Sequence, residues 1–145
     1  MNIPEKLSKN SSGLSGEYFV AAELYRRGFN VGLTIGNAKA IDILAEKDGK
    51  VFQIQVKTIR SKKSVSWPLR SDQINNNVIY ILVNLNIDKQ PNYYIINPLD
   101  LRIYQKDYVN RGVVSLTQIA KANRYLNNWS NIKLTENKVH LLIDN

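Results

Sequence analysis

The sequence predicts a single α/β domain, and three observations support this prediction. Residues 14–27 have apolar side chains at helical spacing and are followed by Gly28, which is typical of the end of a helix. Three strand-like segments follow, and the last two are joined by Asp48 and Gly49, a pair that favours a hairpin. Further apolar segments and two helix-like segments complete the chain. The predicted order is α-β-β-β-(β)-β-β-α-α, with a short strand in parentheses.

The N-terminal half justifies the first four elements. Residues 1–12 are polar, and we expect them to be flexible ahead of one domain that spans residues 13–145. One face of the first helix, Leu14 to Arg27, carries its apolar side chains, namely Leu14, Val20, Ala21 and Leu24. The three strands are expected in residues 29–35, 40–47 and 50–58, with turns at residues 36–39 and 48–49.

The C-terminal half justifies the remaining elements. A short strand is expected at residues 65–67, and the hydrophobic run "VIYILVNL" (78–85) predicts a buried strand. The strand "NYYII" is followed by Asn97 and Pro98, which predict a helix that closes at Gly112. Ser115 to Gln118 fits a capping box ahead of a last helical segment that runs to about Trp129.

Composition narrows the classes of function. Twenty basic against twelve acidic residues give a formal net charge of +8, which favours a polyanionic partner, chiefly nucleic acid. The absence of Cys excludes disulfides, zinc–thiolate sites and thiol nucleophiles. No apolar run reaches the length of a membrane span, and the N-terminus lacks an apolar core, so we expect a cytoplasmic protein without membrane contact. The one histidine, His140, has no pattern of Ser/His/Asp catalysis around it.

The segment "VFQIQVKT" (51–58) has two different faces. Phe52, Ile54 and Val56 alternate as a core face, while Gln55 and Lys57 lie on the other. The polar face is either a solvated strand face or the wall of an active site.

Two acidic residues occupy positions where acids are disfavoured. Glu17 shares the apolar face of the first helix, although a solvated acid near the start of the helix is the alternative. Asp42 lies between two isoleucines in a strand, although it could face solvent at the edge.

Since the strand of Asp42 is the hairpin partner of the strand of Gln55 and Lys57, the side chains of Glu17, Asp42, Gln55 and Lys57 are all expected to converge. Carboxylate and amide oxygens suit Mg²⁺, and a lysine offsets charge on a phosphate.

At these residues the sequence resembles the PD-(D/E)XK nuclease superfamily. Its signature is an acid, a spacer, and then acid-any-lysine on the next strand, and Asp42 followed by Gln55-Val56-Lys57 is similar to it. The segment "SGEYFVAAELYRRGFNV" resembles the leading helix of the resolvase-like and homing-endonuclease-like branches. The resemblance covers residues 13–84.

The resemblance implies a restriction-endonuclease-like fold, in which helices flank a central mixed β-sheet. It implies a magnesium-dependent DNA endonuclease, with Mn²⁺ as an alternative ion and no organic cofactor. Glu17, Asp42 and Gln55 would be metal ligands, and Lys57 the catalytic lysine. Water would attack in line without a covalent intermediate. The resemblance leaves open whether the chain is a monomer or a homodimer.

The sequence departs from the family pattern at Gln55, where an amide replaces the second acid, and at Ile41, where the family has proline. The proline supplies no ligand, and some branches carry glutamine at the other position. The loss of one negative charge nevertheless keeps a second reading open, a non-catalytic module that binds DNA or a protein partner. An RNA-binding protein with a chance motif is a third reading, but no stacking-rich motif supports it.

The basic run "RSKK" follows the strand of Lys57. Its cations Arg60, Lys62 and Lys63, together with Arg70, are candidate DNA contacts, although a solvated loop is the alternative. Trp67 and Trp129 are expected in the core rather than as base-stacking platforms.

Overall fold

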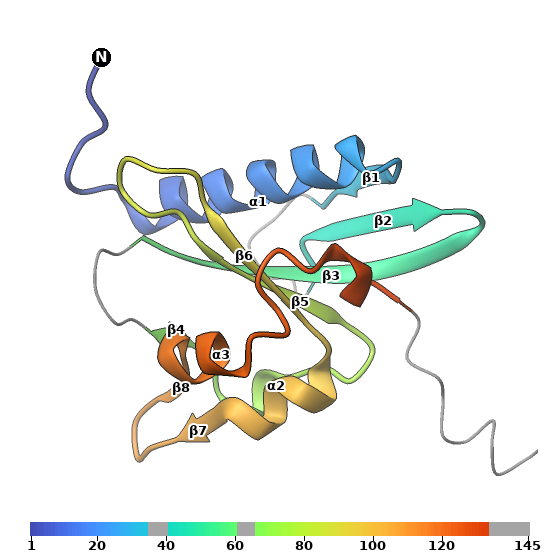
Figure 1. Cartoon of the computed structure of the whole chain (residues 1–145). Helices are drawn as coiled ribbons and strands as arrows, with labels where there is room; N and C mark the ends of the chain where they lie inside the picture. Colours follow the sequence, from blue (N-terminus) through green and yellow to red (C-terminus); the bar gives the residue numbers. More distant parts are fainter. Residues whose placement is uncertain (35–40, 61–65, 134–145) are drawn as a thin grey trace, which may run out of the picture.

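A central five-stranded sheet separates two layers of the protein. The computed structural model describes residues 1–34, 41–60 and 66–133. The helix α1 crosses one face of this sheet, and α2, α3 and a small second sheet lie against the other (Figure 1). The elements are α1 (Lys9–Arg26), β1 (Asn30–Leu33), β2 (Ile43–Lys47), β3 (Lys50–Ile59), β4 (Ser66–Pro68), η1 (Ser71–Gln73), β5 (Ile79–Asn84), β6 (Asn92–Ile96), α2 (Pro98–Tyr104), β7 (Gln105–Asp107), β8 (Gly112–Ser115), α3 (Leu116–Ala122) and η2 (Trp129–Asn131).

The central sheet is mixed, as the sequence predicted. Its strand order is β1-β2-β3-β5-β6, and only the β3–β5 pair is parallel. The turn between β2 and β3 has positive φ at Asp48 and at Gly49, the geometry that the hairpin prediction requires. The second sheet is antiparallel with the order β4-β8-β7.

The first helix differs from its prediction at the N-terminus. It begins at Lys9, because the side chain of Ser8 accepts a hydrogen bond from the Ser11 N–H and caps the helix. Residues 9–12, expected to be flexible, are therefore helical. Leu14, expected on the buried face, is 43% exposed. The end of the helix is as predicted, since Gly28 has a φ of +85°.

The C-terminal half contains the largest corrections. The side chain of Asn97 caps α2 as predicted, but α2 ends at Tyr104 instead of continuing to Gly112. The chain then forms the hairpin β7–β8, because β8 pairs with the distant strand β4. Pairing across the fold thus overrides a helical pattern. The Ser115 side chain makes no capping bond, so the predicted capping box is absent, and α3 ends before Asn123, whose left-handed backbone stops it well short of Trp129.

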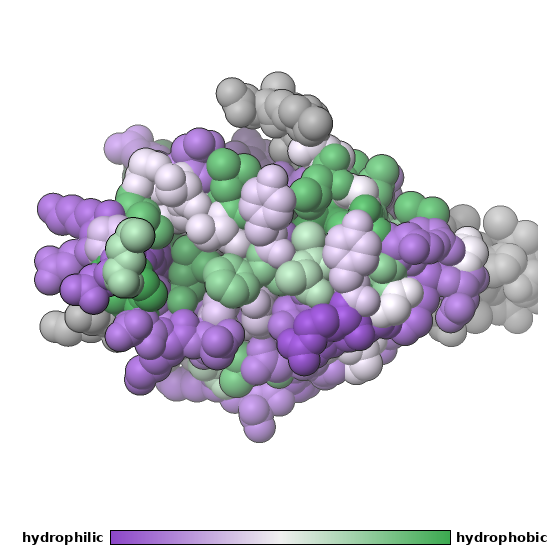
Figure 2. Space-filling model, turned by 90° about the horizontal axis from the view of Figure 1, so that it is seen from above, coloured by the Kyte–Doolittle hydropathy of each residue, from purple (hydrophilic) through white to green (hydrophobic). Residues whose placement is uncertain are grey.

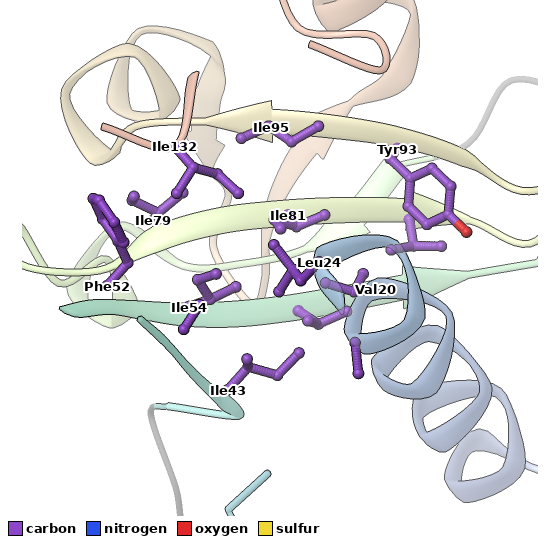
Figure 3. Packing of buried hydrophobic residues seen from close by; sticks show 14 of the residues in the cluster. Val20, Leu24, Ile43, Phe52, Ile54, Ile79, Ile81, Tyr93, Ile95 and Ile132 are labelled. Carbon is purple, nitrogen blue, oxygen red and sulfur yellow. The ribbon is translucent and has the colours of Figure 1, made fainter. Parts of the chain in front are cut away.

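Two hydrophobic clusters hold the layers together. Side chains of α1, such as Val20 and Leu24, pack against Ile54 and Ile81 of the sheet (Figure 3). On the opposite face Trp67 is fully buried and donates its indole N–H to the Val83 carbonyl. Trp67 is thus the core residue that was expected, and Trp129 is half-buried against the α1 cluster.

The outer side of α1 is partly apolar. Figure 2 looks onto the face that α1 crosses and shows hydrophobic residues between hydrophilic ones. Leu14, Tyr18, Phe19 and Tyr25 of α1 are among the exposed large hydrophobic residues. Within residues 1–34, 41–60 and 66–133, no helix has the length and apolar character needed to cross a membrane.

The packing of α1 gives a first testable prediction. Leu24→Ala removes a fully buried side chain and should lower the free energy of unfolding by about 2–5 kcal/mol, measured by urea denaturation. Leu14→Ala, on the same helix but exposed, should change the free energy of unfolding by less than about 0.5 kcal/mol. Equal losses in the two variants would contradict the placement of α1.

Candidate active site

The candidate site lies where β2 separates from β3. Their strand pairing runs from Lys47↔Lys50 to Ile43↔Ile54. Asp42, one residue before β2, still donates its N–H to the Ile54 carbonyl at 2.9 Å. Beyond this point β3 continues to Ile59, and in the described part of the chain no strand pairs with it on the β2 side.

Beyond the end of the β2–β3 pairing, the carboxylate of Asp42 acts as the hydrogen-bond acceptor that a neighbouring strand would otherwise provide. Its Oδ2 accepts a hydrogen bond from the Val56 backbone N–H at 2.8 Å. A buried backbone N–H without a partner destabilises a fold, and this contact gives the Val56 N–H the partner that β2 no longer supplies. The alternation pattern in the sequence indicated the strand but not this bond. The bond fixes the Asp42 carboxylate between Gln55 and Lys57, the two neighbours of Val56.

Groups from both faces of the sheet reach this carboxylate. Gln55 and Lys57 pair with Tyr80 and Leu82 of β5, whose side chains belong to the cluster on the face away from α1. Lys57 is half-buried and close enough for its charge to stabilise ionised Asp42. Glu17 comes from α1 on the other face. The structure therefore brings Glu17, Asp42 and Lys57 together, and places Gln55 beside Lys57 on the same strand face.

The pKa values of the two acids reflect this crowding. Burial raises the pKa of Glu17, and the negative charge of Asp42 and a hydrogen bond between the two carboxyl groups raise it further. Burial also raises the pKa of Asp42, although the Val56 N–H, the Lys57 charge and the Glu17 hydrogen bond oppose the shift. Two adjacent acids with raised pKa values hold protons more tightly than free carboxyl groups do, and a cation would relieve their repulsion.

The donor set fits a hard divalent cation. The described residues contain no cluster of three or more Asp, Glu, His or Cys side chains that could hold a metal. Two carboxylates, Glu17 and Asp42, are nevertheless sufficient for Mg²⁺, which keeps several waters. The amide oxygen of Gln55 is a third candidate ligand. The oxygen-only chemistry of these residues is the chemistry that Mg²⁺ or Mn²⁺ prefers.

The four candidate DNA-contact residues differ in their surroundings. Arg60 donates hydrogen bonds to the backbone carbonyls of Glu5 and Pro4, so its guanidinium has partners within the chain. Arg70 is partly exposed and lies 3.8 Å from Asp72. Lys62 and Lys63 lie outside the described residues, as does His140.

Comparison with known protein families finds a match that spans more than half of the chain. The sequence profile described as PD-(D/E)XK endonuclease matches residues 7–90. This range contains Glu17, Asp42, Gln55 and Lys57. No curated protein matches the sequence.

Two solved structures are similar to this fold. The bacterial homing endonuclease I-Ssp6803I matches with a TM-score of 0.57 at 17% identity, over 77% of this chain and 76% of that one. The Holliday junction resolvase Hjc of Archaeoglobus fulgidus, an archaeal hyperthermophile, matches with a TM-score of 0.51 at 14% identity, over 75% of this chain and 88% of that one. At these identities the likeness shows the fold, and it confirms the restriction-endonuclease-like architecture.

The raised pKa of Glu17 predicts how stability depends on pH. A carboxyl group whose pKa is higher in the folded state stabilises the fold below its ordinary pKa, and this contribution is lost as pH rises through the folded pKa. Glu17→Gln removes this loss. As the pH rises from acidic to neutral, the melting temperature of Glu17→Gln should therefore rise relative to that of wild type, as measured by thermal denaturation.

A second variant provides a control of opposite sign. Hydrogen bonds from Asn30 and the Gly49 N–H lower the pKa of Glu46, so its contribution is present at neutral pH and lost as pH falls. Glu46→Gln should therefore lose stability relative to wild type at neutral pH. If Glu17→Gln followed the same direction, the arrangement of the two half-buried acids, Glu17 and Asp42, would be wrong.

Proposed function

Because the chain belongs to the PD-(D/E)XK endonuclease family, we propose that it is a metal-dependent DNA endonuclease that hydrolyses phosphodiester bonds at the site of Glu17, Asp42 and Lys57. The observation that carries this proposal is the meeting of the two acids and the lysine where β2 leaves β3. If Lys57 served only in a structural ion pair, one acid beside it would be enough. Here two acids are forced together, which destabilises the fold at neutral pH and suits a cation.

Members of this family generally use divalent metal ions, and we propose Mg²⁺, with Mn²⁺ as a substitute. Bound to the carboxylates of Glu17 and Asp42, the ion would supply Lewis-acid stabilisation of charge on the scissile phosphate. Asp42 is held in place by the Val56 N–H, so little reorganisation is needed to bind a cation. Lys57 holds a positive charge beside Asp42, where negative charge develops as the phosphodiester bond breaks.

DNA is the proposed substrate for two reasons. The net charge of +8 attracts a polyanion. The two similar structures are, by name, a homing endonuclease and a Holliday junction resolvase, which supports DNA over other phosphodiesters. Arg70 and the basic run that includes Lys62 and Lys63 are proposed to bind phosphates. Arg60 is instead proposed to act after exchanging its partners in the N-terminal segment.

Gln55 supports a second candidate function. An amide at this position removes one negative charge from the metal site and weakens metal binding. The second candidate is therefore a non-catalytic module that binds DNA or a protein partner. A non-catalytic module, however, would give no physical reason for the close placement of Lys57, Glu17 and Asp42.

Asp42 and Lys57 give the direct test of the proposed activity, which is nicking of supercoiled plasmid with Mg²⁺ or Mn²⁺ and with a chelator control. Asp42→Asn should abolish nicking but leave DNA binding intact or tighter, because it removes a negative charge from a phosphate site. Lys57→Ala should slow nicking roughly a hundredfold or more, as expected for one lost transition-state contact. Asp48→Asn makes the same charge change in a turn that tolerates asparagine, and should nick like wild type. Full activity in Asp42→Asn would refute the proposed site.

Gln55→Glu distinguishes the two candidate functions. It adds an anionic ligand beside Asp42 and should tighten Mg²⁺ binding, measured by calorimetry, and either raise the nicking rate or create it. Gln53→Glu adds the same charge two residues earlier on the same face of the strand, at an exposed position, and should do neither. If wild type and Gln55→Glu are both inert at millimolar metal, and Asp42→Asn alters neither metal nor DNA binding, the non-catalytic module is the correct description.

A further inference from the structure

Besides the packing of Val20 and Leu24, the helix α1 and the strand β3 make one especially close contact, between Gly16 and Thr58. Gly16 of α1 is buried, and a Cβ added to it would lie 1.9 Å from the Oγ1 atom of Thr58 and 2.9 Å from its Cβ and Cγ2 atoms. Carbon atoms in contact prefer about 3.5–4.0 Å. No side chain larger than that of glycine therefore fits at position 16 while α1 stays at its present distance from β3.

This contact borders the candidate active site on both sides. Gly16 directly precedes Glu17, and Thr58 directly follows Lys57. Glycine inside a helix is unfavourable compared with alanine, so its presence needs a reason in the packing. At Gly13, on the same helix, an added Cβ would meet no atom within 4 Å. The close approach is thus local to the residue next to Glu17.

Thr58 contributes shape rather than a hydrogen bond. Its Oγ1 atom is buried and has no hydrogen-bond partner, which is unfavourable for a hydroxyl. The β-branched side chain occupies the space that the missing side chain of Gly16 leaves. Thr58 is also held from the other side, because it pairs with Val83 in the centre of the sheet. Thr58 therefore limits how closely α1 can approach β3.

We propose that Gly16 and Thr58 are positioning residues of the candidate active site, whose close contact sets the depth of α1 and thereby holds the Glu17 carboxyl against that of Asp42. The inference rests on the proposed nuclease function for its activity readout. Its metal-binding readout needs only that Glu17 and Asp42 bind the cation together.

Gly16→Ala tests the proposal. The added methyl group pushes α1 away from β3 by on the order of 1 Å, and a displacement of this size can slow catalysis about a hundredfold. The nicking rate constant kcat should fall by about that factor while KM for plasmid DNA stays the same. The affinity for Mn²⁺, measured by electron paramagnetic resonance without DNA, should weaken as well, which a mere loss of stability would not cause in the folded fraction.

Three further variants serve as controls. Gly13→Ala changes the same helix where space is open, and should leave kcat and Mn²⁺ affinity unchanged. Thr58→Val keeps the shape and removes the unpaired hydroxyl, so it should be more stable than wild type and equally active. The double variant Gly16→Ala with Thr58→Gly moves the missing Cβ from helix to strand, and should regain Mn²⁺ affinity and much of kcat.

The outcomes separate this proposal from the proposed function. Wild type that binds Mn²⁺ but never nicks DNA refutes the nuclease function, while weaker Mn²⁺ binding in Gly16→Ala still supports the positioning role. Unchanged Mn²⁺ affinity and kcat in Gly16→Ala overturn the positioning role, as does inactivity of a folded Thr58→Val. If Gly16→Ala does not fold, Thr58→Ala, which loosens the contact without a clash, should weaken Mn²⁺ binding, and wild-type affinity there overturns the proposal.

Discussion

The hydrogen bond from the Val56 N–H to the Asp42 carboxylate is the interaction on which the site depends. A strand that loses its neighbour exposes backbone donors, and a fold must pair or cover them. Here a side chain replaces the neighbour, so the sheet opens without leaving that donor unpaired. The same bond fixes a carboxylate in the opening, where an acid from the α1 face and a lysine from the opposite face both reach it.

This arrangement raises the pKa values of two neighbouring acids, which destabilises the fold when they are ionised, and the burial of the two hydrophobic clusters offsets that destabilisation. The inner face of α1 inserts Val20, Ala21 and Leu24 into a cluster that spans β2, β3, β5 and β6. Glu17 lies on that helix one residue after its tightest contact with β3. The helix cannot retreat from Asp42 without giving up this burial. Packing thus holds together two groups that repel each other when ionised.

The C-terminal half builds the layer behind Lys57. The strands β4, β7 and β8, with α2 and α3, enclose Trp67, Tyr80 and Leu82 on the face away from α1. This layer buries the neighbours of Gln55 and Lys57 on β5, whereas these two polar residues themselves stay half-buried at the open side of β3. The second layer therefore gives the polar side chains a low-dielectric wall, which strengthens the electrostatic interactions beside it.

The sequence by itself determined the elements whose signals are local. The α1 end at Gly28, the hairpin turn at Asp48 and Gly49, and the buried strand β5 all follow from spacing or turn chemistry. It also singled out Glu17 and Asp42, because acids at apolar positions stand out in a periodic pattern, and Gln55 and Lys57, because they share the polar face of an alternating strand. Only the tertiary structure decided the pairing of β8 with β4, the Asp42–Val56 bond and the Gly16–Thr58 contact. Each of these joins residues far apart in the chain, and the free energy that favours them arises only once the distant partner is in place.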